Sequence, residues 1–222
     1  FNDLIFEINK DNKIYIKQYG FIKQKNQYNF VDCHIAGGNR THQMGSKILC
    51  GSEYLNLSYV SHKIDKNILE IVQKSDKVCI TSYFEKYDNT NSLRINSVIK
   101  NISNESIVLE EYSIFSLIGF GKNGVDSTKS LELTNFIQSH HSECQTRTNT
   151  FNELGLFRGN KNGQKVISGR NIGSWSTKEK LPLAIVKSNE DNEYFAFEIE
   201  SNNSWYYEFG DIEQEIYLSI ST

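Results

Sequence analysis

Apolar and polar residues alternate with a period of two along most of the chain, and this alternation constrains the fold more than any other feature. Such alternation points successive side chains to opposite faces of a β-strand. Clusters of Asn, Asp, Gly and Ser separate the alternating segments, and these residues favour turns. The pattern predicts an all-β protein of antiparallel strands, either a sandwich or a barrel. The segments that carry it are residues 13–19, 54–62, 78–87, 92–102, 106–117, 181–188, 194–201 and 216–222.

The length of the chain and the absence of a linker-like segment predict a single domain over residues 1–222. No internal repeat is visible, and no stretch rich in Pro, Gly and Ser divides the chain, which contains one proline. No helix longer than a turn or two is expected. A single β-sandwich of 222 residues is ordinary in size.

Composition excludes several classes of function. The net charge is −3 and the pI is near 6.0, so the chain has no basic field for nucleic acid. No apolar run is long enough to span a bilayer, and no signal-peptide pattern appears. The four cysteines are scattered, which is typical of reduced thiols in a cytosolic protein, so we expect a cytoplasmic location. No clustered metal ligands and no glycine-rich phosphate loop occur, and we expect neither metal nor cofactor.

Residues 92–102 and 106–117 form the best-defined predicted pair of strands. They flank a Ser-Asn-Glu-Ser turn and are expected to form a hairpin where one sheet packs on another. Ile114 and Phe115 are then core candidates. Alternation would place residues 93, 95 and 97 on one face, and Arg94, Asn96 and Val98 on the other.

Paired carboxylates are candidates for acid/base or nucleophilic catalysis where both side chains face one substrate. Glu110 and Glu111 are neighbours in a predicted strand, so they should point to opposite faces and not to one substrate. Glu213 and Glu215 can share a face, with Asp211 close by. An exposed acidic face is the commoner explanation for that cluster.

A second candidate for catalysis is the segment that contains His140, His141, Glu143 and Cys144. A Cys/His pair can generate a nucleophile. The alternative is a polar loop whose histidines bind backbone or water, and the sequence favours that alternative.

The loop of residues 36–47 is the best candidate for binding. Its paired glycines permit a tight, exposed backbone, and functional residues often lie on loops carried by a rigid sheet. Side chains suited to sugar hydroxyls or to a partner surface are Asn39, Arg40, His42, Gln43 and Lys47. A purely structural loop is an equally good explanation.

The two tryptophans, Trp175 and Trp205, each have two interpretations. An exposed tryptophan can stack on a sugar ring, whereas a tryptophan in a sandwich more often belongs to the core. The core interpretation is favoured for both.

Several segments, in order, resemble the N-terminal domain of glycoside hydrolase family 36, the α-galactosidase type. They are DCHIAGGNRTHQMGSK, YLNLSYVSHKIDKNILEIVQKSDKVCITSYFEKYD, RINSVIKNISNESIVLEEYSIFSLIG, LTNFIQSHHSECQTRTNTFNELGL, NIGSWSTKEKLPLAIV and the Trp-Tyr-Tyr-Glu strand. Together they cover residues 31–217.

The resemblance implies an antiparallel β-supersandwich as a non-catalytic N-terminal domain. It further implies a catalytic (β/α)8 barrel after residue 222 that hydrolyses terminal α-galactosides with retention. The domain would pack on its own barrel and support a homo-oligomer. The candidates Asn39, Arg40, His42, Lys47 and Trp175 would then lie at the substrate rim or at an interface, and the isolated chain would be inactive.

Two alternatives stay open. The chain can be a stand-alone carbohydrate-binding or protein-interaction sandwich. More remotely, it can be a small hydrolase that uses His140, Glu143 or Cys144.

Overall fold

A computed structural model describes residues 3–41, 48–156 and 165–222. Every ladder between named strands is antiparallel, and the predicted all-β sandwich is confirmed. The one described helix is a short 3₁₀ segment, η1 (Gly124–Lys129), in agreement with the expectation of no helix longer than a turn or two. Within the described ranges, no helix is long and apolar enough to cross a membrane.

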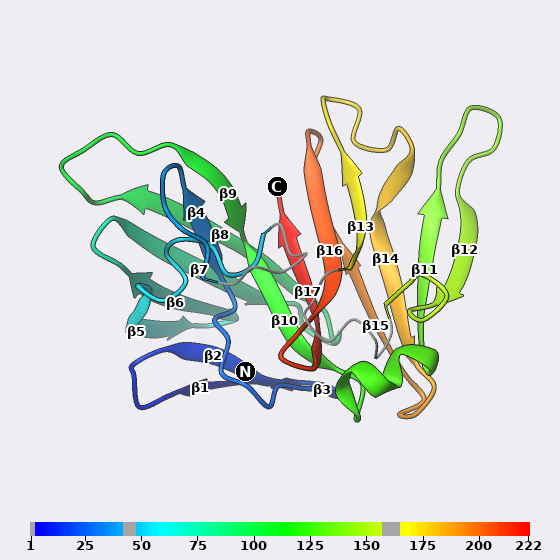
Figure 1. The fold of residues 1–222 in the computed structure, drawn as a ribbon, viewed down its shortest axis with the longest axis horizontal. Coiled ribbons are helices and arrows are strands. Elements are labelled where there is room, and N and C mark those ends of the chain that lie inside the picture. Colours follow the sequence, from blue (N-terminus) through cyan, green and yellow to red (C-terminus); the bar gives the residue numbers. More distant parts are fainter. Residues whose placement is uncertain (1–2, 42–47, 157–164) are drawn as a thin grey trace.

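Three four-stranded sheets form most of the molecule (Figure 1). The first runs β5 (Ser58–Asp65), β6 (Ile68–Lys74), β7 (Val78–Lys86) and β8 (Leu93–Asn101). The second runs β10 (Phe115–Phe120), β17 (Glu215–Ser221), β16 (Trp205–Ile212) and β13 (Val166–Asn171). The third runs β12 (Gln145–Thr150), β11 (Leu131–Ile137), β14 (Lys180–Ser188) and β15 (Glu193–Glu198).

Two small sheets complete the fold. One contains β1 (Leu4–Ile8), β2 (Ile14–Tyr19) and β3 (Ile22–Lys23), and the other pairs β4 (Asp32–Ile35) with β9 (Leu109–Ser113). β3 lies beside β10, where Gly119 has φ +106°, and a Cβ there would lie 2.2 Å from the Lys23 carbonyl oxygen. Glycine at this position therefore lets the two backbones approach.

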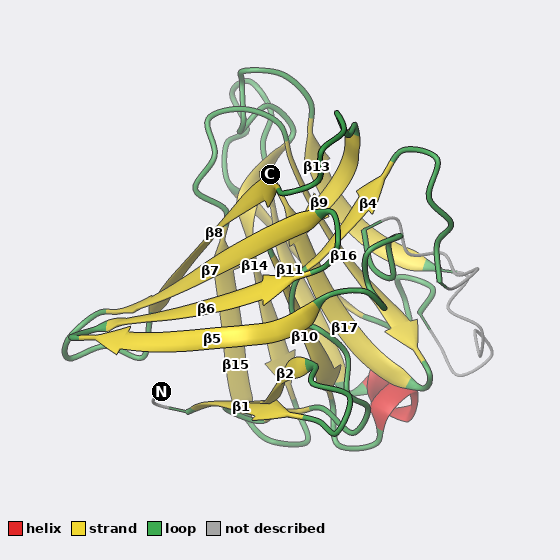
Figure 2. Ribbon diagram, turned by 90° about the vertical axis from the view of Figure 1, so that its left-hand side faces the viewer, coloured by secondary structure: helices red, strands yellow, loops and turns green. Residues whose placement is uncertain are grey.

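One apolar core joins the sheets. Phe209 of β16 contacts Phe151 and Phe197, which ties the second sheet to the third. Phe84 of β7 contacts Phe6 and Phe30, which ties the first sheet to the N-terminal strands. Figure 2 shows β5–β8 running across the direction of β14–β17. Of these rings, Phe84 and Phe197 occupy inner positions of the alternating segments, as the period of two predicts.

The predicted hairpin of residues 92–117 is wrong. β8 pairs with β7, and β9 pairs instead with β4. The Asn101 side chain accepts a hydrogen bond from Ser103 N and donates one to Glu105 O, so the intervening segment folds as a loop and not as a tight hairpin turn. The chain therefore leaves one sheet and enters another.

Within these strands the predicted faces are confirmed. Arg94, Asn96 and Val98 are exposed, whereas the side chains of residues 93, 95 and 97 are half-buried. Phe115 is buried and Ile114 is partly buried against the core.

Candidate functional site

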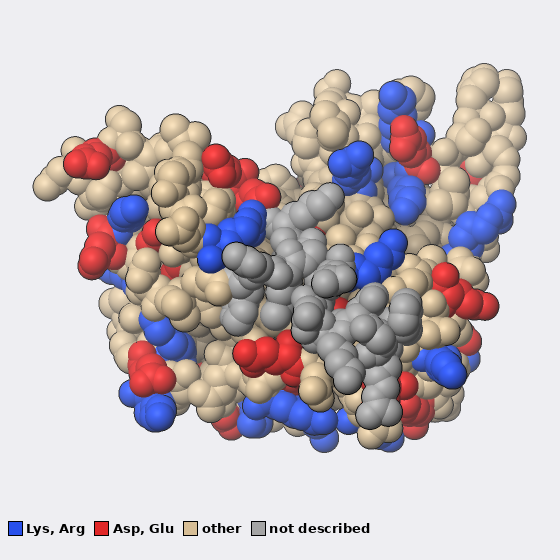
Figure 3. Space-filling model, viewed as in Figure 1, with Lys and Arg blue, Asp and Glu red and all other residues tan. Residues whose placement is uncertain are grey.

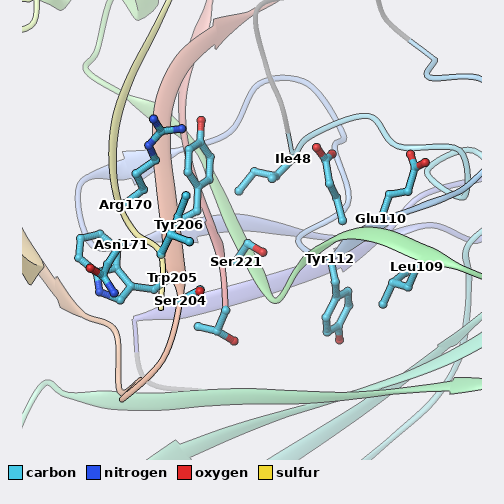
Figure 4. A pocket seen from close by; sticks show the side chains of 13 residues that line it. Ile48, Leu109, Glu110, Tyr112, Arg170, Asn171, Ser204, Trp205, Tyr206 and Ser221 are labelled. Atoms are coloured by element: carbon cyan, nitrogen blue, oxygen red, sulfur yellow. The ribbon is translucent and has the colours of Figure 1, made fainter. Parts of the chain in front are cut away.

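A pocket of about 470 Å³ lies where β13, β16 and β17 approach β9. We call it the bulge pocket. Figure 4 shows Arg170 and Tyr206 on one wall, Glu110 on the other, and Ile48 and Ser221 between them. The lining residues are Ile48, Leu109, Glu110, Glu111, Tyr112, Arg170, Asn171, Ile172, Ser204, Trp205, Tyr206, Ser221 and Thr222. The pocket is thus bounded by a basic and an acidic wall with apolar residues among them.

A β-bulge brings two carboxylates to this pocket. His34 pairs with Glu111 and Ile35 with Leu109, so Glu110 is an extra residue in β9. Such a residue shifts the alternation by one and re-aims the side chains. Glu110 Oε2 lies 3.4 Å from His34 Nε2, and Glu111 is the register partner of His34. The expectation that the two glutamates face opposite ways is therefore wrong.

His34 has a defined orientation behind Glu110. Its Nδ1 accepts a hydrogen bond of 3.1 Å from Ser52 N, so a neutral ring carries its proton on Nε2, facing Glu110. His34 therefore helps to hold Glu110, and with it the acidic wall of the pocket, in position.

Arg40, a predicted candidate, lies behind Glu111. Its Nη2 forms an ion pair with Glu111 Oε2, and its Nη1 donates to Leu49 O at 3.5 Å. Arg40 is half-buried and does not line the pocket, so it positions Glu111 and the chain at residue 49. Asn39 is exposed next to it, and His42 and Lys47 lie outside the described residues.

Asp32 anchors the same region from within. Its carboxylate accepts hydrogen bonds from Cys33 N at 2.7 Å and Gly51 N at 2.8 Å. Complete burial raises the pKa of Asp32 to about 7, although these backbone donors and the charge of Arg40 oppose that rise. Asp32 therefore has a structural role, since it ties residue 51 to β4.

The basic wall contains Arg170, which is exposed. Its backbone pairs with Tyr206 in the ladder between β13 and β16, and its side chain forms no hydrogen bond or ion pair with the residues that the structure describes. Tyr206, its register partner, donates to Glu208 Oε2 at 2.7 Å. Burial and then the charge of Glu208 raise the pKa of Tyr206, which therefore stays a neutral phenol. The guanidinium of Arg170 can therefore donate to a ligand in the bulge pocket, while Tyr206 supplies a fixed aromatic surface.

The two tryptophans have opposite environments. Trp205 is 2% exposed, and its Nε1 donates to Ser176 O at 2.7 Å, so the core interpretation is confirmed for it. Trp175 is 65% exposed, and the core interpretation is wrong for it. Ile172, on the same loop, is 79% exposed and lines the bulge pocket. The 172–179 loop thus presents two large apolar side chains beside the pocket.

The second candidate for catalysis from the sequence lies in a loop with ordinary structural hydrogen bonds. The segment from His140 to Cys144 forms the exposed tip between β11 and β12. There, Glu143 Oε1 accepts from His141 N at 3.1 Å and Gln138 Oε1 accepts from Cys144 N at 2.5 Å. No hydrogen bond within this described segment joins Cys144 to a histidine ring. This geometry agrees with a polar loop.

The acidic cluster near the C-terminus is not an exposed face. Asp211 and Glu215 are buried, and only Glu213 is exposed. Glu215 accepts hydrogen bonds from Lys25 N at 2.6 Å and Asn26 N at 2.7 Å. The expectation of an exposed face is wrong for Glu215, because alternation gives no information about backbone donors from a distant turn.

The remaining titratable groups form no concentrated site. Within the ranges described, no group of three His, Cys, Asp or Glu side chains could hold a metal ion, and the four cysteines are free. Figure 3 shows acidic and basic side chains interspersed over one face. The bulge pocket therefore has the best-defined set of convergent polar groups, and they are suited to binding.

Comparison with known proteins shows the fold alone. No protein-family model and no curated protein matches the sequence. The structure is similar to the crystal structure of the GH36 α-galactosidase AgaA from Geobacillus stearothermophilus, with a TM-score of 0.60 at 12% sequence identity. The match covers 89% of this chain and 27% of that chain, so this chain spans about a quarter of its length. The chain has a GH36-like fold.

Sequence reasoning did not predict that the residues lining the bulge pocket come together. Arg170 follows a turn-rich segment and has no motif around it. Glu110 and Glu111 were noticed, but the bulge that turns both to one side is set by pairing with β4. The only available signal was two adjacent acidic residues in an otherwise alternating strand.

Proposed function

We propose that the chain is the non-catalytic N-terminal domain, residues 1–222, of an α-galactosidase-like retaining glycoside hydrolase. A catalytic (β/α)8 barrel after residue 222 would hydrolyse terminal α-galactosides. The observation that carries this proposal is the fold likeness to AgaA, which extends over 89% of this chain and only 27% of that one. The chain would pack on its barrel and support a homo-oligomer in the cytoplasm.

The 172–179 loop is the surface that best suits contact with the barrel. Ile172, which lines the bulge pocket, is 79% exposed and Trp175 on the same loop is 65% exposed, and exposed apolar patches commonly mark interaction sites. The loop is fixed from beneath, because Gly173 N donates to Ser204 Oγ at 3.0 Å and Trp205 holds Ser176. A rigid support lets exposed side chains bind a partner at low entropic cost.

The first test is an assay of the longest native gene product and of this chain on an aryl α-galactoside. We expect turnover by the long form alone. Turnover by the chain itself, lost in His140→Ala, would instead support the small-hydrolase alternative.

A second test addresses the contact surface. In the long form, Ile172→Ser and Trp175→Ser should lower the melting temperature, because their apolar contacts with the barrel are lost. In the isolated chain both substitutions should be close to neutral. Ile64→Ser is the matched control, since Ile64 is 60% exposed on β5, away from the bulge pocket. Equal effects of all three substitutions in the long form would contradict docking through this loop.

A stand-alone carbohydrate-binding module is the second candidate. The exposed Trp175 favours it, because an exposed indole can stack on a sugar ring, and the bulge pocket offers donors and acceptors for hydroxyl groups. Calorimetric titration of the isolated chain with galactose and raffinose-type oligosaccharides distinguishes the two. Binding lost in both Trp175→Ala and Arg170→Ala, together with an inactive long form, would favour the module.

A further inference from the structure

A second and larger cavity, of about 920 Å³, opens between the edges of two sheets. We call it the β8–β15 groove, after the strands that form its walls. It is separate from the 172–179 loop. The side chains that line its inner part include Leu93, Ile95, Phe195 and Phe197, which pack against the main core. The groove is therefore an open side of the sandwich where core residues are only partly covered.

Both walls are edge strands. Among the described strands, β8 pairs only with β7, and β15 pairs only with β14. Each edge leaves a row of backbone N–H and C=O groups without a partner strand, which is a template for an added strand. The edge strand β12, by contrast, is polar throughout its sequence Gln-Thr-Arg-Thr-Asn-Thr and lines neither this groove nor the bulge pocket.

The groove is acidic. Its charged lining residues are Asp3, Arg94, Glu193, Glu198 and Glu200, so acidic groups outnumber the single basic one. Arg94 is already paired with Glu200 at 2.6 Å. Three of the four carboxylates lie on β15 or directly beyond it, so this wall attracts positive charge.

The two faces of β15 differ, and this difference determines where the basic residues of an added strand would lie. Its inner face carries Phe195 and Phe197, whereas Tyr194, Ala196 and Glu198 lie on the outer face. On that outer face Lys187 Nζ already lies 6.0 Å from the centroid of the Tyr194 ring. A strand added to the free edge would place alternate residues against the phenylalanines and the others beside Tyr194 and Glu198.

We propose that the β8–β15 groove binds an extended peptide segment of a partner protein, with alternating apolar and basic residues, as an antiparallel or parallel strand on the free edge of β15. The apolar residues cover Phe195 and Phe197. The basic residues meet Tyr194 and Glu198 by cation–π contact and ion pairing. This inference does not rest on the proposed enzymatic context.

The experiment uses a capped peptide of about six residues that alternates valine and lysine, because that length matches a typical strand. Binding to the isotope-labelled chain is followed by amide chemical shifts and by hydrogen exchange. We expect shift changes on β15 and slower exchange of those β15 amides that do not pair with β14. A peptide that alternates valine and glutamate should bind at least about tenfold more weakly.

Two variants and one modified peptide test the individual contacts. Glu198→Gln should weaken the valine–lysine peptide about two- to fivefold at low salt, as expected for an exposed ion pair. Glu105→Gln, in the loop after β8, is the matched control and should leave binding unchanged. N-methylation of alternate peptide bonds should abolish binding, because it removes the donors to the β15 edge.

Several results would overturn the proposal. They are no binding at millimolar peptide, equal affinity for the glutamate peptide, or undiminished binding after N-methylation. Protection of β12 amides in place of β15 amides would locate strand addition at another edge. Protection that grows with protein concentration without peptide would show that a second copy of the chain occupies the groove.

Discussion

Asp32→Asn gives the sharpest test of how charge is buried beneath the acidic wall of the bulge pocket. Asp32 is 1% exposed, and burial raises its pKa from near 3.8 to about 7. The folded state therefore binds one more proton than the unfolded state between these values. The free energy of unfolding should fall as pH rises through this window, by about 1.4 kcal/mol per unit and by roughly 4 kcal/mol in all.

The assay is urea unfolding of wild type and Asp32→Asn at several values between pH 4.5 and pH 8. Asparagine cannot titrate, so the variant should lose this component of the pH dependence. At every pH the variant should also be less stable than wild type by about 1–3 kcal/mol, because one of the two backbone N–H donors loses its acceptor. Asp88→Asn, at an exposed turn, should keep the wild-type dependence. Equal pH dependence in wild type and Asp32→Asn would refute the reasoning.

Three further substitutions test the fold. Phe115→Ala should destabilise the chain by about 3–5 kcal/mol, because the ring is 4% exposed, and a circular-dichroism melt measures the loss. Trp205→Phe should cost about 1–2 kcal/mol by leaving the Ser176 carbonyl without its donor, and faster hydrogen exchange in the 172–179 loop would confirm the mechanism. Gly119→Ala should destabilise the chain by more than about 1 kcal/mol in chemical denaturation, because φ is +106° and the new Cβ meets the β3 backbone. An unchanged unfolding midpoint in any of the three would contradict the corresponding contact.

Strand positions and faces were predictable because alternation is a local property. Residues 93–100 of β8 alternate between half-buried and exposed as the period of two assigns, and Phe115 is in the core. Strand pairing was not predictable to the same degree. The partner of β9 is β4, more than seventy residues earlier, and local turn chemistry carries no signal for it.

In the candidate site, too, local features were predictable from the sequence and contacts that depend on strand pairing were not. Loop composition identified Arg40, but its contact with Glu111 depends on the pairing of β4 and β9. Alternation gave the wrong orientation for Glu110, since one inserted residue reverses every side chain beyond it. Trp175 and Trp205 have similar sequence surroundings, and only the packing of the loop on β16 separates the exposed ring from the buried one.

The buried carboxylates of this domain act as hydrogen-bond acceptors within the fold. Asp32 binds two backbone N–H groups, Glu215 binds two more, and Glu208 accepts from the hydroxyls of Tyr206 and Tyr217. Each therefore acts as a fixed acceptor: Asp32 and Glu215 join segments distant in sequence, and Glu208 joins the neighbouring strands β16 and β17. A general acid or base must instead exchange its proton with a substrate, which requires access to the ligand. The two carboxylates that reach the bulge pocket, on the bulge of β9, are engaged by His34 and Arg40. This arrangement supports a domain that holds surfaces in place for a partner or ligand, and it agrees with the proposal that hydrolysis occurs on a separate barrel.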